Sequence, residues 1–382
     1  MTITDDKKNI HALNIFKITV VSLSVKVIYY LFFFLLHLYT YNRLDYKYLG
    51  QYFFTSYFNN DSGWYQKIAE NGYPIQHGFH LGEQSVYAFF PLYPFIVHFL
   101  EIIFRINSEP AFFLATTLIS LMCFIIFYKF LIQIGKNTQV ALITTIVLLV
   151  FPHNYYFSMY YTEGLFLLLL LLSYYFVNAQ KRGAFILVSS LLVLTKVSGI
   201  VMFLPLAIYF IEKNGLSLRN RLGAFRFIQL FTPMVVTFFL YCVFLFVKTG
   251  DFFAFKTAAE YGWGGKHQLP FTTIYKSIFT SSSPWYLKYN AVYSFVFLLL
   301  SVALLAKKQI SYGVLTLLVI LLPLSEGSSI SQPRFISVLF PFVIMGGDYI
   351  NSTKYKYSIL FLSFIFQLLL LYFWSINHPF SF

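Results

Sequence analysis

Long apolar runs recur along almost the whole chain, and they constrain the fold more than any other feature of the sequence. Most of them approach the roughly 17–25 residues that an α-helix needs to cross a bilayer. Only 11% of the 382 residues are charged and 58% are hydrophobic, so a water-soluble fold could not bury this apolar surface. We therefore predict an all-α integral membrane protein. The runs cover about residues 18–38, 88–105, 111–134, 138–152, 161–178, 183–211, 227–248, 290–306, 310–325, 334–350 and 356–376.

Basic residues collect in the short loops between these runs and predict the orientation of the chain. Loops rich in lysine and arginine stay in the cytoplasm, so the polar segments 39–85, 249–289 and 326–333 should face the opposite side. The net charge of +13 then reflects topology and contact with anionic lipid headgroups, and we expect no nucleic-acid binding. The basic loops contain Lys7, Lys8 and Lys17, residues 213–226, Lys307 and Lys308, and Lys354 and Lys356.

The predicted architecture is one polytopic domain, residues 1–382, with about eleven membrane-spanning segments and two sizeable external loops at about 39–85 and 249–289. Eleven simple spans, however, place Lys181 and Arg182 outside and residues 161–163 inside. The opposite placement requires half-helices near 138–178 and a broken helix at 196–199. We favour the broken arrangement, because polar residues interrupt an otherwise apolar run there, although such breaks need cover from protein or a water-filled cavity.

The first candidate site follows the first predicted helix, at the non-cytoplasmic surface. Asp61 precedes the aromatic pair Trp64 and Tyr65. A carboxylate in this position can act as a general base, and the two rings can stack on a sugar or sit in the interfacial aromatic belt. Alternatively, Asp61 caps a short helix that begins at Ser62.

Four further charged residues lie in or beside apolar segments. Glu163 opens a very apolar helix, where the helix dipole alone would favour a carboxylate. Lys196 is central to the run 183–211, and a buried cation lining a cavity would suit a phosphate. Arg334 opens a late helix, where it either anchors to lipid headgroups or grips a phosphate with its planar fork. Asp251 follows a glycine in the second external loop.

Five short segments spread over residues 61–341 carry a resemblance to a known family. In this order they resemble motifs of the GPI mannosyltransferase 2 (PIG-V-like) family and its prokaryotic relatives, which is similar to the GT-C group of polytopic glycosyltransferases. The chain departs from the family pattern at Asn60, Phe252 and Lys196, where Trp, Pro and Arg are usual. The segments are Asp61–Tyr73, Phe89–Pro94, Phe157–Glu163, Gly250–Phe255 with Trp263, and Pro333–Pro341.

The resemblance implies a GT-C-like helix bundle with mannosyltransferase-like activity. The enzyme would move a mannosyl or other hexosyl residue, with inversion, from polyprenyl- or dolichyl-phosphate-mannose to a hydroxyl of a glycolipid or glycan acceptor on the non-cytoplasmic face. Asp61 would be the catalytic base, and the lipid-phosphate sugar would be the donor, without a further cofactor. A prokaryotic plasma membrane is the expected location, or the endoplasmic reticulum membrane in a eukaryote. The residues expected to bind substrates are Trp64, Tyr65, Glu163, Lys196, Asp251 and Arg334.

Two further expectations concern metals and the alternative function. No tight spacing of histidine, cysteine or carboxylate residues predicts a metal site, so we expect none. A secondary transporter or a lipid flippase without glycosyl transfer is the alternative to an enzyme. A transporter would place charges near the bilayer midplane and show paired half-helices in repeats, whereas this sequence shows no internal repeat.

Overall fold

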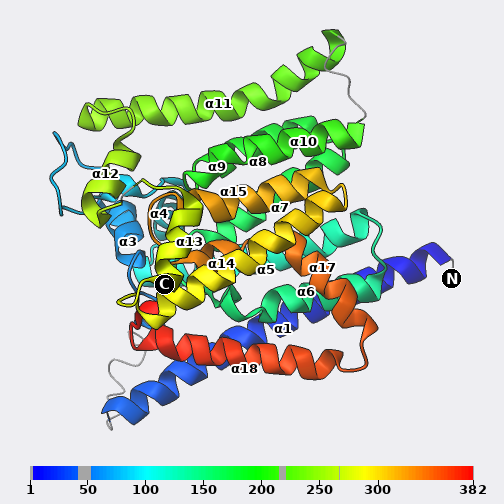
Figure 1. Ribbon diagram of the computed structural model, residues 1–382. Coiled ribbons are helices and arrows are strands. Elements are labelled where there is room, and N and C mark those ends of the chain that lie inside the picture. The colour runs from blue at the N-terminus through cyan, green and yellow to red at the C-terminus, as the bar shows by residue number, and fades with distance from the viewer. Residues whose placement is uncertain (1–2, 42–52, 215–220, 266, 382) are drawn as a thin grey trace.

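The computed structural model describes residues 3–41, 53–214, 221–265 and 267–381, and the regular structure in this part of the chain is all helical, without strands (Figure 1). Five helices are long and apolar enough to cross a bilayer, which confirms the prediction of an all-α membrane protein. The count of about eleven spans stays a prediction. The five helices are α1 (Ile3–Tyr41), α5 (Ser108–Gln133), α11 (Arg221–Thr249), α14 (Trp285–Ala306) and α18 (Lys356–Ser375).

The remaining α-helices of the described chain are shorter. A helix of 13 residues is only about 20 Å long, which is less than the roughly 30 Å of bilayer hydrocarbon. The shorter apolar helices are α4 (Leu92–Phe104), α6 (Thr138–Val150), α7 (Glu163–Asn178), α8 (Arg182–Val193) and α15 (Ile310–Leu324). The others are α3 (Ser62–Asn71), α9 (Ser198–Val201), α10 (Phe203–Asn214), α12 (Ala254–Trp263), α13 (Pro270–Phe279), α16 (Gln332–Ile336) and α17 (Phe340–Ser352).

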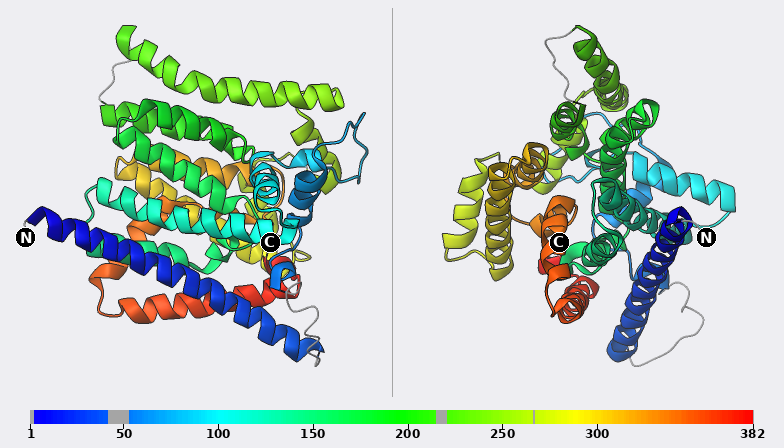
Figure 2. Two further views of the ribbon diagram at one scale, coloured as in Figure 1. Left: turned by 180° about the vertical axis from the view of Figure 1, so that it is seen from behind. Right: turned by 90° about the vertical axis from the view of Figure 1, so that its right-hand side faces the viewer.

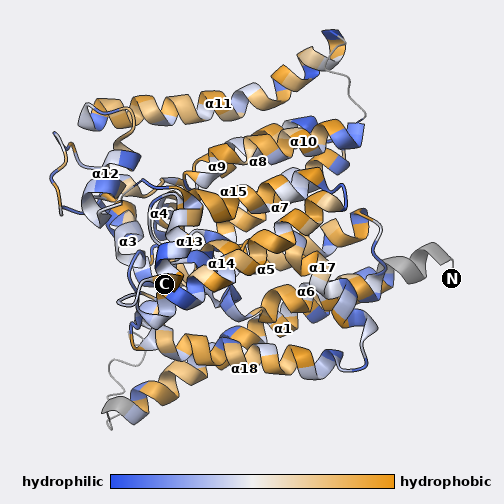
Figure 3. Ribbon diagram, in the orientation of Figure 1, coloured by the Kyte–Doolittle hydropathy of each residue, from blue (hydrophilic) through white to orange (hydrophobic). Residues whose placement is uncertain are grey.

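The short helix α7 lies inside the bundle, and four of the five long helices form much of its outer wall. The leucine-rich α7 is buried along almost its whole length, with Leu167, Leu170 and Leu171 fully enclosed. In the long helices α1, α11, α14 and α18, by contrast, only 28–33% of an apolar stretch of 18 residues is buried inside the protein. Figure 3 shows the apolar residues along these helices and the polar residues toward the ends of the bundle. The exposed apolar faces of the outer helices therefore suit contact with lipid.

The starts of α8 and α11 and the end of α10 lie at one end of the bundle, together with the N-terminal part of α1 and the connection from α17 to α18 (Figure 1). Arg182, Asn214 and Arg226 line a common cavity, and Tyr209 Oη donates a hydrogen bond of 2.9 Å to Asn178. Figure 2 shows α3 and α12 at the other end. The placement of Lys181 and Arg182 with the other basic loops, which the broken arrangement predicted, is confirmed.

The chain turns back at Lys196. The predicted interruption is confirmed, because α8 ends at Val193 and α9 begins at Ser198. The run 183–211 therefore does not cross as one continuous span, in line with the favoured broken arrangement: the start of α8 and the end of α10 lie at the same end of the bundle, so these helices run in opposite directions. The turn is tight, since a Cβ at Gly199 would lie 2.2 Å from the carbonyl oxygen of Leu192.

The predicted span at 88–105 is also wrong. Both ends of α4 lie at the end of the bundle that carries α3: Leu92 N donates to Leu194 O at 3.0 Å, and Ser108 Oγ, just after α4, donates to Glu70 at 2.7 Å. In Figure 1 the axis of α4 runs across the long helices. Exposed apolar residues such as Phe99 give α4 the character of a helix in the membrane interface.

Two other predicted segments differ in detail. The run 334–350 is interrupted, because α16 ends at Ile336 and α17 begins at Phe340, where Pro341 cannot supply the N–H that a continuous helix needs. The two predicted external loops contain helices: α3 lies in 39–85, and α12 and α13 lie in 249–289. Residues 42–52 of the first loop lie outside the described residues.

We predict that Gly199→Ala lowers the midpoint of thermal unfolding in detergent. The added methyl group would overlap backbone atoms of α8, and such overpacking costs about 1–3 kcal/mol. Gly183→Ala is the matched control, because Gly183 lies in the same helical pair and a Cβ there meets nothing within 4 Å. Equal midpoints for the two variants would contradict the tight turn.

Candidate functional site

Four charged residues from four separate segments meet at the end of the bundle that carries α3. We call Asp61, Glu163, Lys196 and Arg334 the charged cluster. Arg334 Nη1 lies 2.5 Å from Asp61 Oδ2, and Arg334 Nε lies 2.8 Å from Glu163 Oε1. Lys196 Nζ lies 3.4 Å from the same oxygen of Glu163. Residues up to 273 positions apart in sequence thus form one continuous set of ion pairs.

Local structure explains why each member reaches the cluster. Asp61 immediately precedes α3, and Glu163 is the first residue of α7. Lys196 lies in the turn between α8 and α9, and Arg334 lies in the five-residue helix α16. Every member therefore belongs to a helix end or a break, where the backbone leaves its regular path and the side chains can converge.

Glu163 is the centre of the cluster and its most deeply buried member. Its side chain is 0% exposed, whereas that of Asp61 is 25% exposed. Glu163 Oε2 is buried and has no hydrogen-bond partner among the described residues. A buried polar atom of this kind is usually satisfied by water or a ligand. The cluster therefore runs from a solvent-accessible carboxylate to an enclosed carboxylate with one free oxygen.

The two cations are also held by aromatic rings. The guanidinium carbon of Arg334 lies 4.1 Å from the centre of the Tyr161 ring, and Lys196 Nζ lies 4.6 Å from that of Phe166. Both distances fit cation–π attraction. Tyr161 was not among the residues predicted for the site, although it lies two positions before Glu163 in a motif that the resemblance covers. Its position in this motif, so close to Glu163, was the sequence feature that could have identified Tyr161 as a site residue.

The proposed capping role of Asp61 finds no support in the geometry. Helix α3 does begin at Ser62, as that alternative required, but the Asp61 side chain accepts no capping hydrogen bond. Its Oδ2 pairs with Arg334 instead. The carboxylate is thus directed toward the cluster and away from the amide groups of its own helix.

Of the two aromatic residues after Asp61, Tyr65 lies in the core and Trp64 lies nearer the surface. Tyr65 is buried, and its Oη lies 3.4 Å from Thr162 Oγ1, directly before Glu163. Trp64 is half-buried and stacks on Phe89 with ring centres 5.9 Å apart, and Trp263 meets its edge at 6.0 Å. Trp64 therefore joins the first external segment to the second, and Tyr65 supports the start of α7.

Asp251 lies apart from the charged cluster. One oxygen accepts a hydrogen bond from the Phe253 amide at 2.8 Å, and the other accepts from Thr257 Oγ1 at 2.5 Å. Both contacts are local and hold the turn that leads into α12. Among the described residues, Asp251 forms no ion pair with a member of the charged cluster. Its substrate-binding role stays a prediction.

Neither metal ligands nor known relatives add a further clue. Within the described ranges, no three histidine, cysteine or carboxylate side chains are close enough to hold a metal ion together. In comparisons with known proteins, no family model and no curated protein matches this chain. The functional argument therefore starts from the charged cluster.

We predict that Glu163→Gln strongly destabilises the protein. The change leaves two largely buried cations without their shared carboxylate, and breaking a buried ion pair in this way costs about 3–5 kcal/mol. Glu260→Gln is the control, since Glu260 pairs with Lys256 at 3.5 Å near the surface and such pairs contribute about 0–1 kcal/mol. Thermal unfolding in detergent should show a much larger fall in midpoint for Glu163→Gln. Equal falls would contradict the central role of Glu163.

Proposed function

We propose that the protein is a membrane glycosyltransferase of GT-C-like architecture. It moves a mannosyl or other hexosyl residue from a polyprenyl- or dolichyl-phosphate sugar to an acceptor hydroxyl with inversion. The observation that carries the proposal is the charged cluster, in which a partly exposed carboxylate lies beside two cations at the end of a membrane bundle. Inverting transfer from a lipid phosphate needs these groups: a base for the acceptor and positive charge for the leaving phosphate.

Asp61 has the geometry of the base. Its Oδ2 is held by Arg334, while its Oδ1 makes no hydrogen bond with any described residue. An acceptor hydroxyl can therefore donate to Oδ1. As the hydroxyl oxygen forms its bond to the anomeric carbon, its proton passes to Asp61. The bond from that carbon to the phosphate oxygen breaks on the opposite face, so one displacement inverts the anomeric centre.

Arg334 and Lys196 supply the positive charge for the leaving phosphate. The ion pairs of Arg334 use Nε and Nη1, so Nη2 stays available to a phosphate oxygen. Lys196 is held by a single carboxylate oxygen at 3.4 Å, and its ammonium group has further donors. Because the paired carboxylates fix both cations before substrate binds, little reorganisation is needed during the reaction.

The remaining predicted residues have supporting roles in this proposal. Trp64 lies at the junction of the two external segments, where a sugar could reach its ring by taking the place of Lys67 Nζ, which lies 4.1 Å from the ring centre. Tyr65 holds the start of α7 beside Glu163. Asp251 shapes the approach from the second external loop. The reaction takes place on the non-cytoplasmic face, and the acceptor is a glycolipid or glycan. A prokaryotic plasma membrane is the proposed location.

Interrupted helices favour a secondary transporter or flippase as the second candidate. The α-helices are interrupted at residues 151–162, 194–197 and 337–339. Three of the four cluster residues lie in or near these interruptions and are joined by ion pairs. Discontinuous helices that direct their ends at a charged substrate are typical of transporters. This function would use the cluster to bind a phosphate without breaking a bond.

We predict that Asp61→Asn reduces glycosyl transfer by about 10²–10⁴-fold, the usual contribution of a general base. The assay is transfer of label from polyprenyl-phosphate-mannose to a lipid extract by the purified protein. The control is Asp348→Asn, which also removes an aspartate paired with a cation, Lys136, but outside the cluster. The control should keep near-normal transfer.

The same pair of variants separates the two candidate functions. Normal turnover in Asp61→Asn would rule out Asp61 as the base. If the wild-type protein moves the lipid-linked sugar between the leaflets of a vesicle but transfers no label, the transporter function replaces the enzyme.

We predict that transfer continues in EDTA. Fixed cations alone can stabilise a departing lipid phosphate, as Arg334 and Lys196 are placed to do. The measurement compares initial rates with and without the chelator, and then after added Mg²⁺ or Mn²⁺. Loss of activity on chelation, restored by either ion, would contradict the prediction and would make Asp61 a candidate metal ligand.

A further inference from the structure

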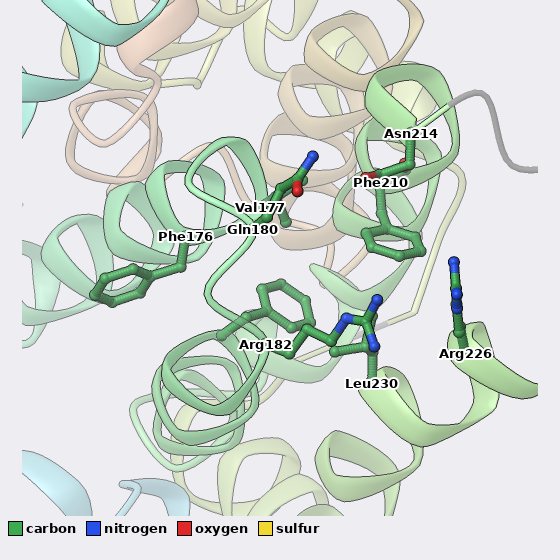
Figure 4. Close-up of a pocket in the computed structure, with 9 residues that line it drawn as sticks. Phe176, Val177, Gln180, Arg182, Phe210, Asn214, Arg226 and Leu230 are labelled. Atoms are coloured by element: carbon green, nitrogen blue, oxygen red, sulfur yellow. The ribbon is translucent and has the colours of Figure 1, made fainter.

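A second site with an excess of positive charge lies at the end of the bundle away from the charged cluster. A cavity of about 350 Å³ opens where the end of α7, the start of α8, the end of α10 and the first turns of α11 meet. Arg182 and Arg226 line it from facing helices, as Figure 4 shows. Among the described residues that line it, none carries a carboxylate.

The two arginines are unlike those of the charged cluster. Arg334 is bound by two carboxylates, whereas Arg182 and Arg226 have neither an ion pair nor a side-chain hydrogen bond within the described ranges. Both are solvent-exposed, so their guanidinium groups are free to bind a ligand. The planar, five-donor fork of arginine matches the oxygens of a phosphate. Two such forks on one cavity are therefore suited to an anion with several oxygens.

The rest of the wall shows that the ligand need not be wholly polar. Phe185 and Phe210 also line the cavity, and the side chains of Gln180 and Asn214 supply amide groups. The cavity also borders α11, a helix long and apolar enough to cross a bilayer. Arg226 is the sixth residue of α11, which places it about 7–8 Å from the start of the helix. The cavity thus lies close to one end of a helix of membrane-spanning length.

We propose that this cavity binds a phosphate group through Arg182 and Arg226, carried either by an anionic lipid headgroup or by a free phosphate. The proposal is independent of the proposed glycosyl transfer, because the site lies at the far ends of α8 and α10 from Lys196. Bound phosphate would hold α11 against α8 and α10 at this end by bridging two helices of like charge.

The test measures binding of phosphatidylglycerol to the full-length protein in detergent by native mass spectrometry, with phosphatidylcholine as the zwitterionic comparison. Arg182→Gln with Arg226→Gln should weaken phosphatidylglycerol binding about tenfold or more, because it removes two charge-assisted contacts. The matched control is Lys181→Gln with Arg221→Gln, which removes the same charge from the same two helix starts but does not touch the cavity. The control should bind within about twofold of wild type.

A second arm distinguishes the source of the phosphate. Inorganic phosphate is added to lipid-depleted protein, and the thermal midpoint is followed. The site is assigned to free phosphate if phosphate raises the thermal midpoint of the wild type and of Lys181→Gln with Arg221→Gln, but not that of Arg182→Gln with Arg226→Gln, and if phosphatidylglycerol is not preferred over phosphatidylcholine. The site is assigned to a lipid headgroup if phosphatidylglycerol is preferred and phosphate leaves the midpoints unchanged.

The proposal is wrong if both double variants lose phosphatidylglycerol binding equally, or if the wild-type protein binds neither probe. It is also wrong if phosphatidylcholine binds as well as phosphatidylglycerol and inorganic phosphate has no effect. Arg182→Lys with Arg226→Lys guards against misfolding: it keeps both charges and should retain part of the binding, since lysine cannot reproduce the fork.

Discussion

The ion pairs of the buried Glu163 carboxylate link the parts of this protein that regular helices leave separate. Arg334 and Lys196 both bind the same oxygen of Glu163, and Arg334 also binds Asp61. Each partner comes from a helix end or break, so the cluster connects α3, α7, the turn after α8, and α16. Inside a membrane protein unpaired charges are very costly, and this mutual neutralisation lets four ionisable groups occupy one site.

The same arrangement also suits the proposed chemistry. A site whose carboxylates and cations balance can be assembled without substrate, and it still presents free acceptor and donor atoms at its edges. Asp61 is the most exposed of the four side chains, and Glu163 is fully enclosed. An incoming hydroxyl therefore meets Asp61 before any other charged member. This order is consistent with a base at the entrance and a phosphate-binding region behind it.

Sequence reasoning predicted the fold class, the break at Lys196 and the residues of the cluster, but not how they pair. Hydropathy identifies apolar segments by composition, and it does not distinguish α4, which lies in the interface, from a helix that crosses. Nor does it reveal that the run 183–211 turns back, because Gly199 permits a close approach that only the three-dimensional path shows. Tyr161 was missed because its role depends on Arg334, which lies 173 positions away in sequence and 4.1 Å away in space.

The short inner helices have a consequence for the membrane itself. Helix α7 has 16 residues and is about 24 Å long, whereas α11 has 29 and is about 43 Å long. Glu163, at the start of α7, is enclosed by protein. Hydrophobic mismatch in a thicker or thinner bilayer would be felt first by the outer helices, through their tilt. The surroundings of Glu163 would therefore change little across membranes of different thickness.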